Sequence, residues 1–274
     1  MSVIFQAQDH SYKSQNPNEN ITWISVTTFI NQFKQKFDPV AQSIKSSKNS
    51  RSKWYKLSPE EIQKHWSSES ERAMTLGTWY HNQREDDILS HQTIQRQGLN
   101  IPIIKPITDG DLKLAPDQGL VEGIYPEHFV YLKSASLCGQ ADRVEVVNNV
   151  ISVFDYKTNK EIKKQSFKNW EGISQMMSGP CSHLEDCNFN HYSLQLSAYL
   201  YIMLKHNPRC KPGKLELQHV IFESEGEDEY KNPIYKKVNG DPVVKDVVSY
   251  ELPYLKNEIR NMIQYHLENE KNKV

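Results

Sequence analysis

The sequence predicts a mixed α/β (α+β) fold, in which helices flank a central mixed β-sheet that contains an antiparallel hairpin. Three observations carry this prediction. Helical patterns fill much of residues 21–90, strand-like segments alternate with turn residues over 121–157, and a helix, a strand and a closing helix follow. This order of elements is typical of a sheet covered by helices.

Two helices are expected before the sheet. A short one lies within residues 21–33 and begins at Ser25 or Thr27. A second begins at Ser58-Pro59-Glu60-Glu61, which combines a capping serine, a proline at the first helical position and a glutamate three residues after the cap. It is expected to reach about residue 90, with a break near 67–70. Four of its residues, spaced four apart, share one face: Ala73, Gly77, His81 and Glu85.

The strands follow a loop that we expect over residues 98–118, where Pro102, Pro106 and Asp109-Gly110 occur. Strands are expected at three places: 121–133, 137–147 and 150–157. Asn148-Asn149 separates the last two, and asparagine tolerates the positive φ angles of a tight hairpin turn. A polar loop over 158–190 then precedes three expected elements: a helix over 193–206, a strand over 215–222 and an amphipathic helix over 255–266.

A two-residue turn would place Asp142 opposite Asp155 and Gln140 opposite Lys157. Apolar residues form two further pairs on that face: Val144 with Val153, and Val146 with Ile151. Both carboxylates would therefore lie on the core-facing side, with Cβ atoms about 4.5–5.5 Å apart. Such carboxylates repel each other, and a divalent cation with oxygen ligands resolves the conflict. A bulge would shift this register, and solvated aspartates on a surface hairpin are the alternative.

Composition limits the class of protein. The chain has 274 residues, of which 24% are charged and 37% hydrophobic, as in an ordinary globular protein. No apolar run approaches the roughly 20 residues that span a bilayer. The start of the chain lacks the pattern of a secretion signal, so we expect an intracellular, cytoplasmic protein. The four cysteines (Cys138, Cys181, Cys187 and Cys210) are too few for a disulfide scaffold.

The charges are segregated although the net charge is only −1. Residues 34–56 carry seven basic residues against one acid, and residues 157–168 carry five lysines against one acid. This segregation favours a phosphate backbone held at one face of the molecule. Two solvated loops are the alternative.

Four short motifs resemble, in order, the PD-(D/E)XK nuclease superfamily, and most closely its RecB-type nuclease domains. They are Gly77-Thr78-Trp79-Tyr80-His81, Gly139-Gln140-Ala141-Asp142, Asp155-Tyr156-Lys157 and Gln195-Leu196-Ser197-Ala198-Tyr199. Phage exonucleases and the mitochondrial genome-maintenance exonuclease share this pattern. The resemblance covers roughly residues 21–199 and implies a restriction-endonuclease-like core over 71–274, after an N-terminal helical and basic segment (1–70) that guides DNA. No single motif is specific, but four in this order are.

The resemblance implies the following site. Mg²⁺ or Mn²⁺ would be held by His81, Asp142, Asp155 and the backbone carbonyl of Tyr156, and the catalytic residues would be Asp142, Asp155 and Lys157. Glu85 and Glu122 are candidate additional ligands. Contacts to DNA, or bracing of the site, are expected from Gln195, Tyr199, Thr158, Lys160, Trp54 and Arg51. Either Trp54 or Tyr55 could stack on unpaired bases. A histidine packed in the helix is the alternative for His81, and a plain core role is the alternative for Tyr199.

The chain departs from its relatives in two ways. Position 155 is aspartate where many members have glutamate. An iron–sulfur cluster found in some relatives is not expected, because no cysteine precedes His81 and none follows Cys210. A compact group (Cys181, His183, Cys187 and His191) does not follow a standard zinc spacing, and a loop with incidental thiols is preferred over a zinc site.

The sequence therefore predicts a divalent-metal-dependent DNA nuclease, an exonuclease that leaves 5′-phosphates, acting in replication, recombination or repair. Single strands or free ends would be favoured, and the absence of helicase motifs would make any motor a separate partner. Lysine- and asparagine-rich composition hints at a virus-encoded protein. Two alternatives are a hydrolase of a small phosphate compound and a non-catalytic nucleic-acid-binding module of the same fold.

Overall fold

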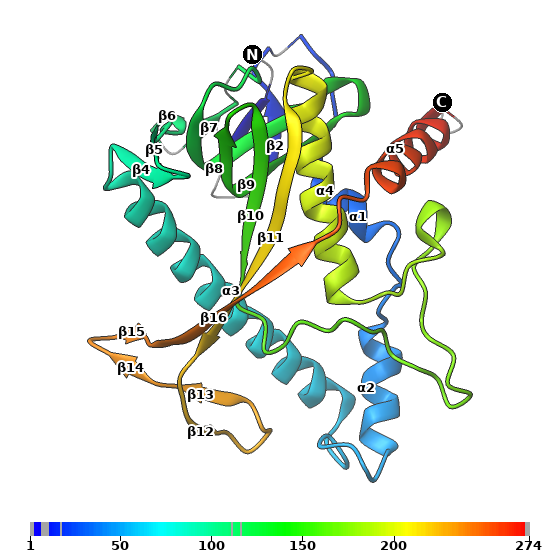
Figure 1. Cartoon of the computed structure of the whole chain (residues 1–274). Coiled ribbons are helices and arrows are strands. Elements are labelled where there is room, and N and C mark those ends of the chain that lie inside the picture. The colour runs from blue at the N-terminus through cyan, green and yellow to red at the C-terminus, as the bar shows by residue number, and fades with distance from the viewer. Residues whose placement is uncertain (1–2, 7–10, 17, 111, 116, 272–274) are drawn as a thin grey trace.

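The computed structural model describes residues 3–6, 11–16, 18–110, 112–115 and 117–271 (Figure 1). Its centre is a six-stranded mixed sheet in the order β16-β11-β10-β9-β3, with β8 also paired to β9. The bounds are β3 (Ile24–Ser25), β8 (Gly123–Leu132), β9 (Leu137–Val147), β10 (Val150–Lys157), β11 (Lys211–Phe222) and β16 (Val244–Leu252). The predicted fold class, with its antiparallel hairpin β9–β10, is confirmed.

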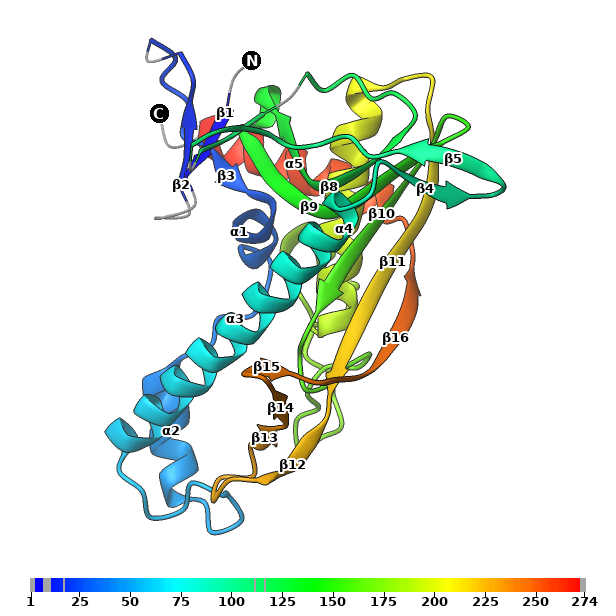
Figure 2. The same cartoon turned by 90° about the vertical axis from the view of Figure 1, so that its left-hand side faces the viewer.

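Helices cover both faces of this sheet (Figures 1 and 2). Apolar residues of α1, α4 and α5 pack on the face that carries Val144 and Val153, whereas α3 packs on the face that carries Tyr156 and Phe222. The helices are α1 (Val26–Asn31), α2 (Pro39–Lys48), α3 (Pro59–Leu89), α4 (Asn188–His206) and α5 (Lys256–Lys271), with short 3-10 turns at Lys133–Ala135 and Gly179–Cys181. Within the described ranges, no helix has both the length and the apolar composition that a membrane crossing requires.

The long helix α3 begins where its capping signal predicts. The Ser58 hydroxyl accepts a hydrogen bond from the backbone N–H of Glu61, and the Glu61 carboxylate accepts one from the backbone N–H of Ser58. The predicted break at 67–70 is wrong, because this serine-rich stretch contains neither proline nor glycine and an ion pair between Glu69 and Arg72 lies along the helix. The boundary expected at residue 70 therefore falls inside one continuous helix.

The β9–β10 hairpin has the predicted register. Asn148 and Asn149 have φ angles of 53° and 58°, and the ladder pairs Ile151 with Val146 and Val153 with Val144. All four of these apolar residues are buried, so the alternative of a solvated surface hairpin is wrong. The ladder ends at the pair Phe154–Arg143, so the predicted pairs Asp142–Asp155 and Gln140–Lys157 are not part of it. The sheet thus opens at the positions of Asp142 and Asp155.

Strand β10 runs parallel to β11, and the connection between parallel strands must cross over the sheet. This crossover consists of residues 158–187 and α4, which packs against β8, β9, β10, β11 and β16. The end of β10 at Lys157 therefore leads directly into a long polar connection and then into α4.

The remaining strands form small sheets at the periphery. The part of residues 98–118 that the structure describes is not a plain loop, because it contains one whole hairpin strand and two strands that pair with each other. The second of these two, Leu112–Leu114, also pairs with the start of the chain. This pairing with the start of the chain joins residues about a hundred positions apart, so no pattern of neighbouring residues in the sequence predicts it. These strands are β1 (Val3–Gln6), β2 (Ser11–Ser14), β4 (Thr93–Arg96), β5 (Leu99–Pro102), β6 (Ile107–Asp109), β7 (Leu112–Leu114), β12 (Ser224–Glu227), β13 (Pro233–Tyr235), β14 (Lys237–Val238) and β15 (Asp241–Pro242).

Candidate metal centre

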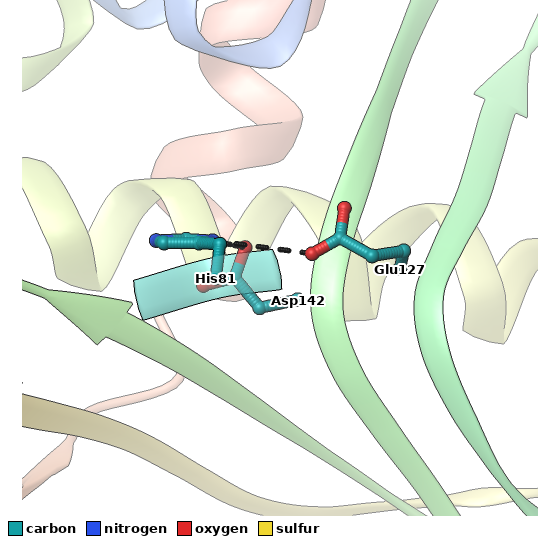
Figure 3. A group of neighbouring side chains, drawn as sticks. All are labelled: His81, Glu127 and Asp142. Atoms are coloured by element: carbon teal, nitrogen blue, oxygen red, sulfur yellow. Dashed lines mark ion pairs between the residues drawn. The ribbon is translucent and has the colours of Figure 1, made fainter. Parts of the chain in front are cut away.

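Three side chains from three elements converge where the hairpin opens. His81 comes from α3, Glu127 from β8 and Asp142 from β9, and their ligand atoms all lie within 4.8 Å of one another. Nδ1 of His81 is 3.5 Å from Oδ1 of Asp142 and 3.9 Å from Oε1 of Glu127 (Figure 3). In the part of the chain that the structure describes, no other three such side chains meet in this way. Two carboxylates with one imidazole suit Mg²⁺ or Mn²⁺.

Glu127 was not predicted from the sequence. It lies between the ladder pairs Pro126–Arg143 and His128–Ala141, so it faces Asp142 across the β8–β9 register without being a ladder pair itself. Its φ of 46° is in the left-handed region, which non-glycine residues adopt at a cost of order 1–3 kcal/mol. A strained residue beside a proline is a local interruption of the strand, and here it presents a carboxylate to the site. The pairing of β8 with β9 is the signal that would have identified it.

His81 is oriented by a backbone carbonyl. Its Nε2 lies 3.1 Å from the carbonyl oxygen of Tyr156, which leaves Nδ1 facing Asp142 and Glu127. A metal-binding histidine commonly donates its second N–H to such a carbonyl. Burial lowers the pKa of His81, but the neighbouring carboxylates of Asp142 and Glu127 outweigh it and raise the pKa to about 11. The Tyr156 carbonyl, a predicted ligand, is thus engaged with His81.

Asp155 and Lys157 form a buried pair next to this group. Asp155 is 1% exposed, and its Oδ2 lies 2.5 Å from Nζ of Lys157. Its Oδ1 is buried and has no hydrogen-bond partner among the described residues. Burial raises the pKa of Asp155 to about 6, although Lys157 opposes that shift. The negative charge on a buried carboxylate oxygen without a partner is not compensated, and a divalent cation held nearby would compensate it.

Asp142 lies between these two sets of side chains. Its Oδ2 accepts a hydrogen bond of 2.7 Å from the backbone N–H of Tyr156, across the gap where the ladder has ended. Burial acts to raise the pKa of Asp142, but His81, Lys157 and this hydrogen bond together lower it. Asp142 is therefore held as an anion. The structure groups Glu127, rather than Asp155, with His81 and Asp142.

The two candidate additional ligands lie in different places. Oε1 of Glu85 is 3.5 Å from Nζ of Lys113, which is itself 3.9 Å from Oε2 of Glu127, so a lysine links Glu85 to the centre. The prediction for Glu122 is wrong. Its carboxylate accepts a hydrogen bond from the backbone N–H of Asn148, at the turn on the opposite end of the hairpin.

Gln195 and Tyr199 brace the sheet beside the site. The Gln195 amide donates to the Tyr199 hydroxyl at 3.3 Å, and Tyr199 is buried. Its ring lies so close to Gly139 that a Cβ at position 139 would be 2.8 Å from Tyr199 Cε1. The glycine of one motif therefore accommodates the tyrosine of another. Gln195 also lines a cavity next to Lys157.

The remaining predicted DNA contacts are of unequal standing. Thr158 lies at the end of β10 against Gly77 of α3, and Arg51 is exposed. Lys160 is engaged with Glu69 and with Asn232 at 2.9 Å. Of the two rings expected to stack on bases, Tyr55 is exposed and Trp54 is buried, so stacking by Trp54 is wrong. The Trp54 indole packs against the rings of His65 and Tyr230, at centroid distances of 5.6 and 5.2 Å.

The Cys/His group does not form a zinc set. The thiols of Cys181 and Cys187 are buried, but His183 faces Glu258 at 3.3 Å and His191 faces Asp186 at 2.5 Å. No tetrahedral set of ligands results among the described residues. These side chains serve the packing of the crossover connection.

Comparison of the chain with protein-family models, with curated proteins and with solved structures finds no match.

Proposed function

We propose that this protein is a divalent-metal-dependent nuclease that hydrolyses phosphodiester bonds of DNA. The observation that carries the proposal is the convergence of His81, Glu127 and Asp142 beside the buried pair of Asp155 and Lys157, whose carboxylate lacks a partner on one oxygen. The order of the four motifs, which resembles RecB-type nuclease domains, supports it independently. The same resemblance extends the proposal to an exonuclease that leaves 5′-phosphates.

The residues present fit a hard divalent cation. His81, Glu127 and Asp142 would hold Mg²⁺ or Mn²⁺, and Asp155 is near enough to interact electrostatically with Asp142 and His81. Such an ion, when bound, lowers the pKa of a coordinated water and polarises a phosphoryl oxygen. The protein contributes a buried setting, in which charges act on one another more strongly than in water.

Lys157 is suited to stabilising negative charge on a phosphate. Burial alone would lower the pKa of Lys157, but Asp155 and Asp142 outweigh burial and raise it, so the ammonium group stays charged. Asp155 also fixes the position of this ammonium group, and Nζ lies 5.2 Å from the centre of the Tyr192 ring. A preorganised cation of this kind is typically worth about 100- to 1,000-fold in rate.

Cleavage of end-labelled DNA tests the proposal. Linear and closed-circular substrates, single- and double-stranded, would be incubated with Mg²⁺, Mn²⁺ or EDTA. We expect metal-dependent cutting that falls about 100- to 1,000-fold in Lys157→Ala. The matched control is Lys205→Ala, which removes an exposed lysine at the end of α4. Sparing of circles would identify an exonuclease.

Three results would contradict the proposal. The first is absence of cutting with either metal, and the second is equal cutting by Lys157→Ala and the wild type. The third is hydrolysis of small phosphate esters, insensitive to salt, without hydrolysis of DNA, which would favour a small-molecule hydrolase. Binding of DNA with no hydrolysis of any substrate would favour a binding module.

A further inference from the structure

The connection between β10 and α4 carries an exposed aromatic tip. This green segment leaves the sheet after Lys157 and extends outward before α4 begins (Figure 1). At its tip, residues 167–173, three large apolar side chains are exposed: Phe167 (75%), Trp170 (91%) and Ile173 (60%). Trp170 has the largest exposed fraction of the large apolar side chains that the structure describes. Clusters of exposed apolar side chains commonly mark binding surfaces.

The tip is an ordered turn. The Asn169 side chain accepts hydrogen bonds of 2.9 Å from the backbone N–H groups of Glu171 and Ile173. Backbone bonds join Asn169 to Ile173 at 3.0 Å and Gln175 to Phe167 at 2.9 Å. Gly172 has a φ of 80°, a backbone angle that residues with a side chain rarely adopt. This backbone geometry holds Trp170 away from the rest of the molecule, whereas an unconstrained chain would cover its own apolar side chains.

The base of the tip is anchored to elements that surround Lys157. The backbone N–H of Ser166 donates to Glu185 at 2.8 Å, and Glu185 lies just before α4, which carries Tyr192 and Gln195. On the other side, the Gln35 amide donates to the carbonyl of Met176 at 2.8 Å. The tip therefore has a defined position relative to the candidate metal centre.

The charges around the tip fit a nucleic acid better than an apolar protein surface. Lys168 and Glu171 lie within the tip and are both exposed, and the segment that joins the tip to Lys157 carries Lys160, Lys163 and Lys164 against Glu161. The neighbouring chain around Gln35 adds exposed Lys36 and Phe37, the latter 68% exposed. Aromatic rings interspersed with cations are the features by which proteins bind single strands, since rings stack on bases and cations contact phosphates.

We propose that the 167–173 tip binds unpaired nucleobases of a single-stranded DNA segment, with the Trp170 indole stacked on a base. This inference rests on the proposed nuclease function, because the tip would bind the single-stranded part of the DNA that the metal centre would cut. It adds a stacking ring that the sequence did not single out: of the two expected from the sequence, Trp54 is buried and Tyr55 is exposed.

The test measures binding without cleavage. Fluorescence anisotropy of a labelled oligothymidine of about 20 nucleotides would be recorded in EDTA for the wild type, Trp170→Ala and Trp170→Phe. Loss of one stacked base should raise Kd about 5- to 150-fold in Trp170→Ala. Trp170→Phe keeps a ring and should retain most of the affinity. Leu99→Ala, which removes an exposed apolar side chain on β5, is the matched control.

Specificity is tested with a blunt duplex and with anionic phospholipid vesicles. We expect Trp170→Ala to leave duplex affinity unchanged. The proposal is overturned by unchanged oligothymidine affinity in Trp170→Ala, by equal losses for oligothymidine and duplex, or by wild-type protein that binds vesicles and no oligothymidine. The binding assay contains EDTA and no cleavage occurs in it, so its result is separate from that of the cleavage assay. Binding of DNA by the tip can be confirmed when the nuclease proposal fails, and the nuclease proposal can be confirmed when the tip does not bind DNA.

Discussion

The two ends of the β9–β10 hairpin carry buried carboxylates that are paired in different ways. The closed cluster consists of Glu145 with Arg96 and Arg143, and the open cluster consists of Asp142, Asp155 and Glu127 with His81 and Lys157. Glu145 is 6% exposed and accepts hydrogen bonds of 2.9 and 2.8 Å from Nε and Nη2 of Arg96. Arg143 lies 3.3 Å from the same carboxylate and packs over the Phe154 ring. Asp155, at the other end of the hairpin, has Lys157 on one oxygen and no hydrogen-bond partner on the other within the described residues.

The difference separates a structural ion pair from the candidate metal centre. At Glu145 the planar guanidinium of Arg96 satisfies both oxygens, and no coordination position remains for a ligand. At the open end, Glu127 and Asp142 are 3.9 and 3.5 Å from one shared imidazole, distances too long for strong hydrogen bonds. Asp155 adds a buried oxygen that has no hydrogen-bond partner among the described residues. Such a carboxylate costs stability, and a protein retains it where a ligand completes the set.

The largest effect that distinguishes the two clusters is stabilisation by metal. At a Mn²⁺ concentration 100 times Kd, the free energy of unfolding should rise by about 3 kcal/mol. For a domain of this size that raises Tm by about 6–12 °C, measured by thermal denaturation with and without EDTA. Glu145→Gln should keep this shift in Tm, because it alters only the closed cluster.

Asp142→Asn should lose the shift, because it removes the anionic ligand at the centre of the open cluster. A wild-type Tm that does not respond to Mn²⁺, or an undiminished response in Asp142→Asn, would show that the open cluster is not the metal site.

The closed cluster should respond to neutralisation with a loss of stability. Glu145→Gln removes the charge that pairs with Arg96 and Arg143, and we expect the free energy of unfolding to fall by about 2 kcal/mol. Partial exposure of Arg96 keeps the loss below that of a fully buried pair. Urea denaturation measures it, with the exposed Glu251→Gln on β16 as a control that should change little. Equal stability of Glu145→Gln and the wild type would contradict a structural role for this cluster.

The open cluster should respond to the same chemical change in the opposite direction. Burial, together with the charge of Asp142, raises the pKa of Glu127, so its ionised form destabilises the metal-free fold near neutral pH. Glu127→Gln should therefore raise the free energy of unfolding in EDTA by about 1 kcal/mol while reducing the metal-induced rise in Tm. A loss of stability in EDTA would mean that Glu127 is a structural residue like Glu145.

The hairpin and the start of α3 were predictable because their determinants are local. Asn148-Asn149 fixes the turn, the turn fixes the register, and alternation then places Asp142 and Asp155 on the buried face. The capping residues of α3 act within four positions of one another. In both cases neighbouring residues supply the interaction, so a pattern in the sequence is sufficient.

The third acid of the centre was not predictable in this way. Glu127 enters the site through the pairing of β8 with β9 and through its positive φ, and the sequence alone favoured Glu85 and Glu122. The opening of the hairpin beyond Phe154 was likewise not encoded in the alternation of residues. Over the same residues β10 stays paired on its other edge with β11, through Lys157.

The sequence by itself determined the class of fold, the hairpin with its buried aspartates and the capped helix that carries His81. Only the tertiary structure decided which acid joins His81 and Asp142, and which aromatic side chains are exposed. Trp54 is covered by Tyr230, a residue distant in the chain, whereas Trp170 is held outward by its own turn. Burial depends on contacts between distant segments, so local sequence patterns do not determine which of two similar side chains is exposed.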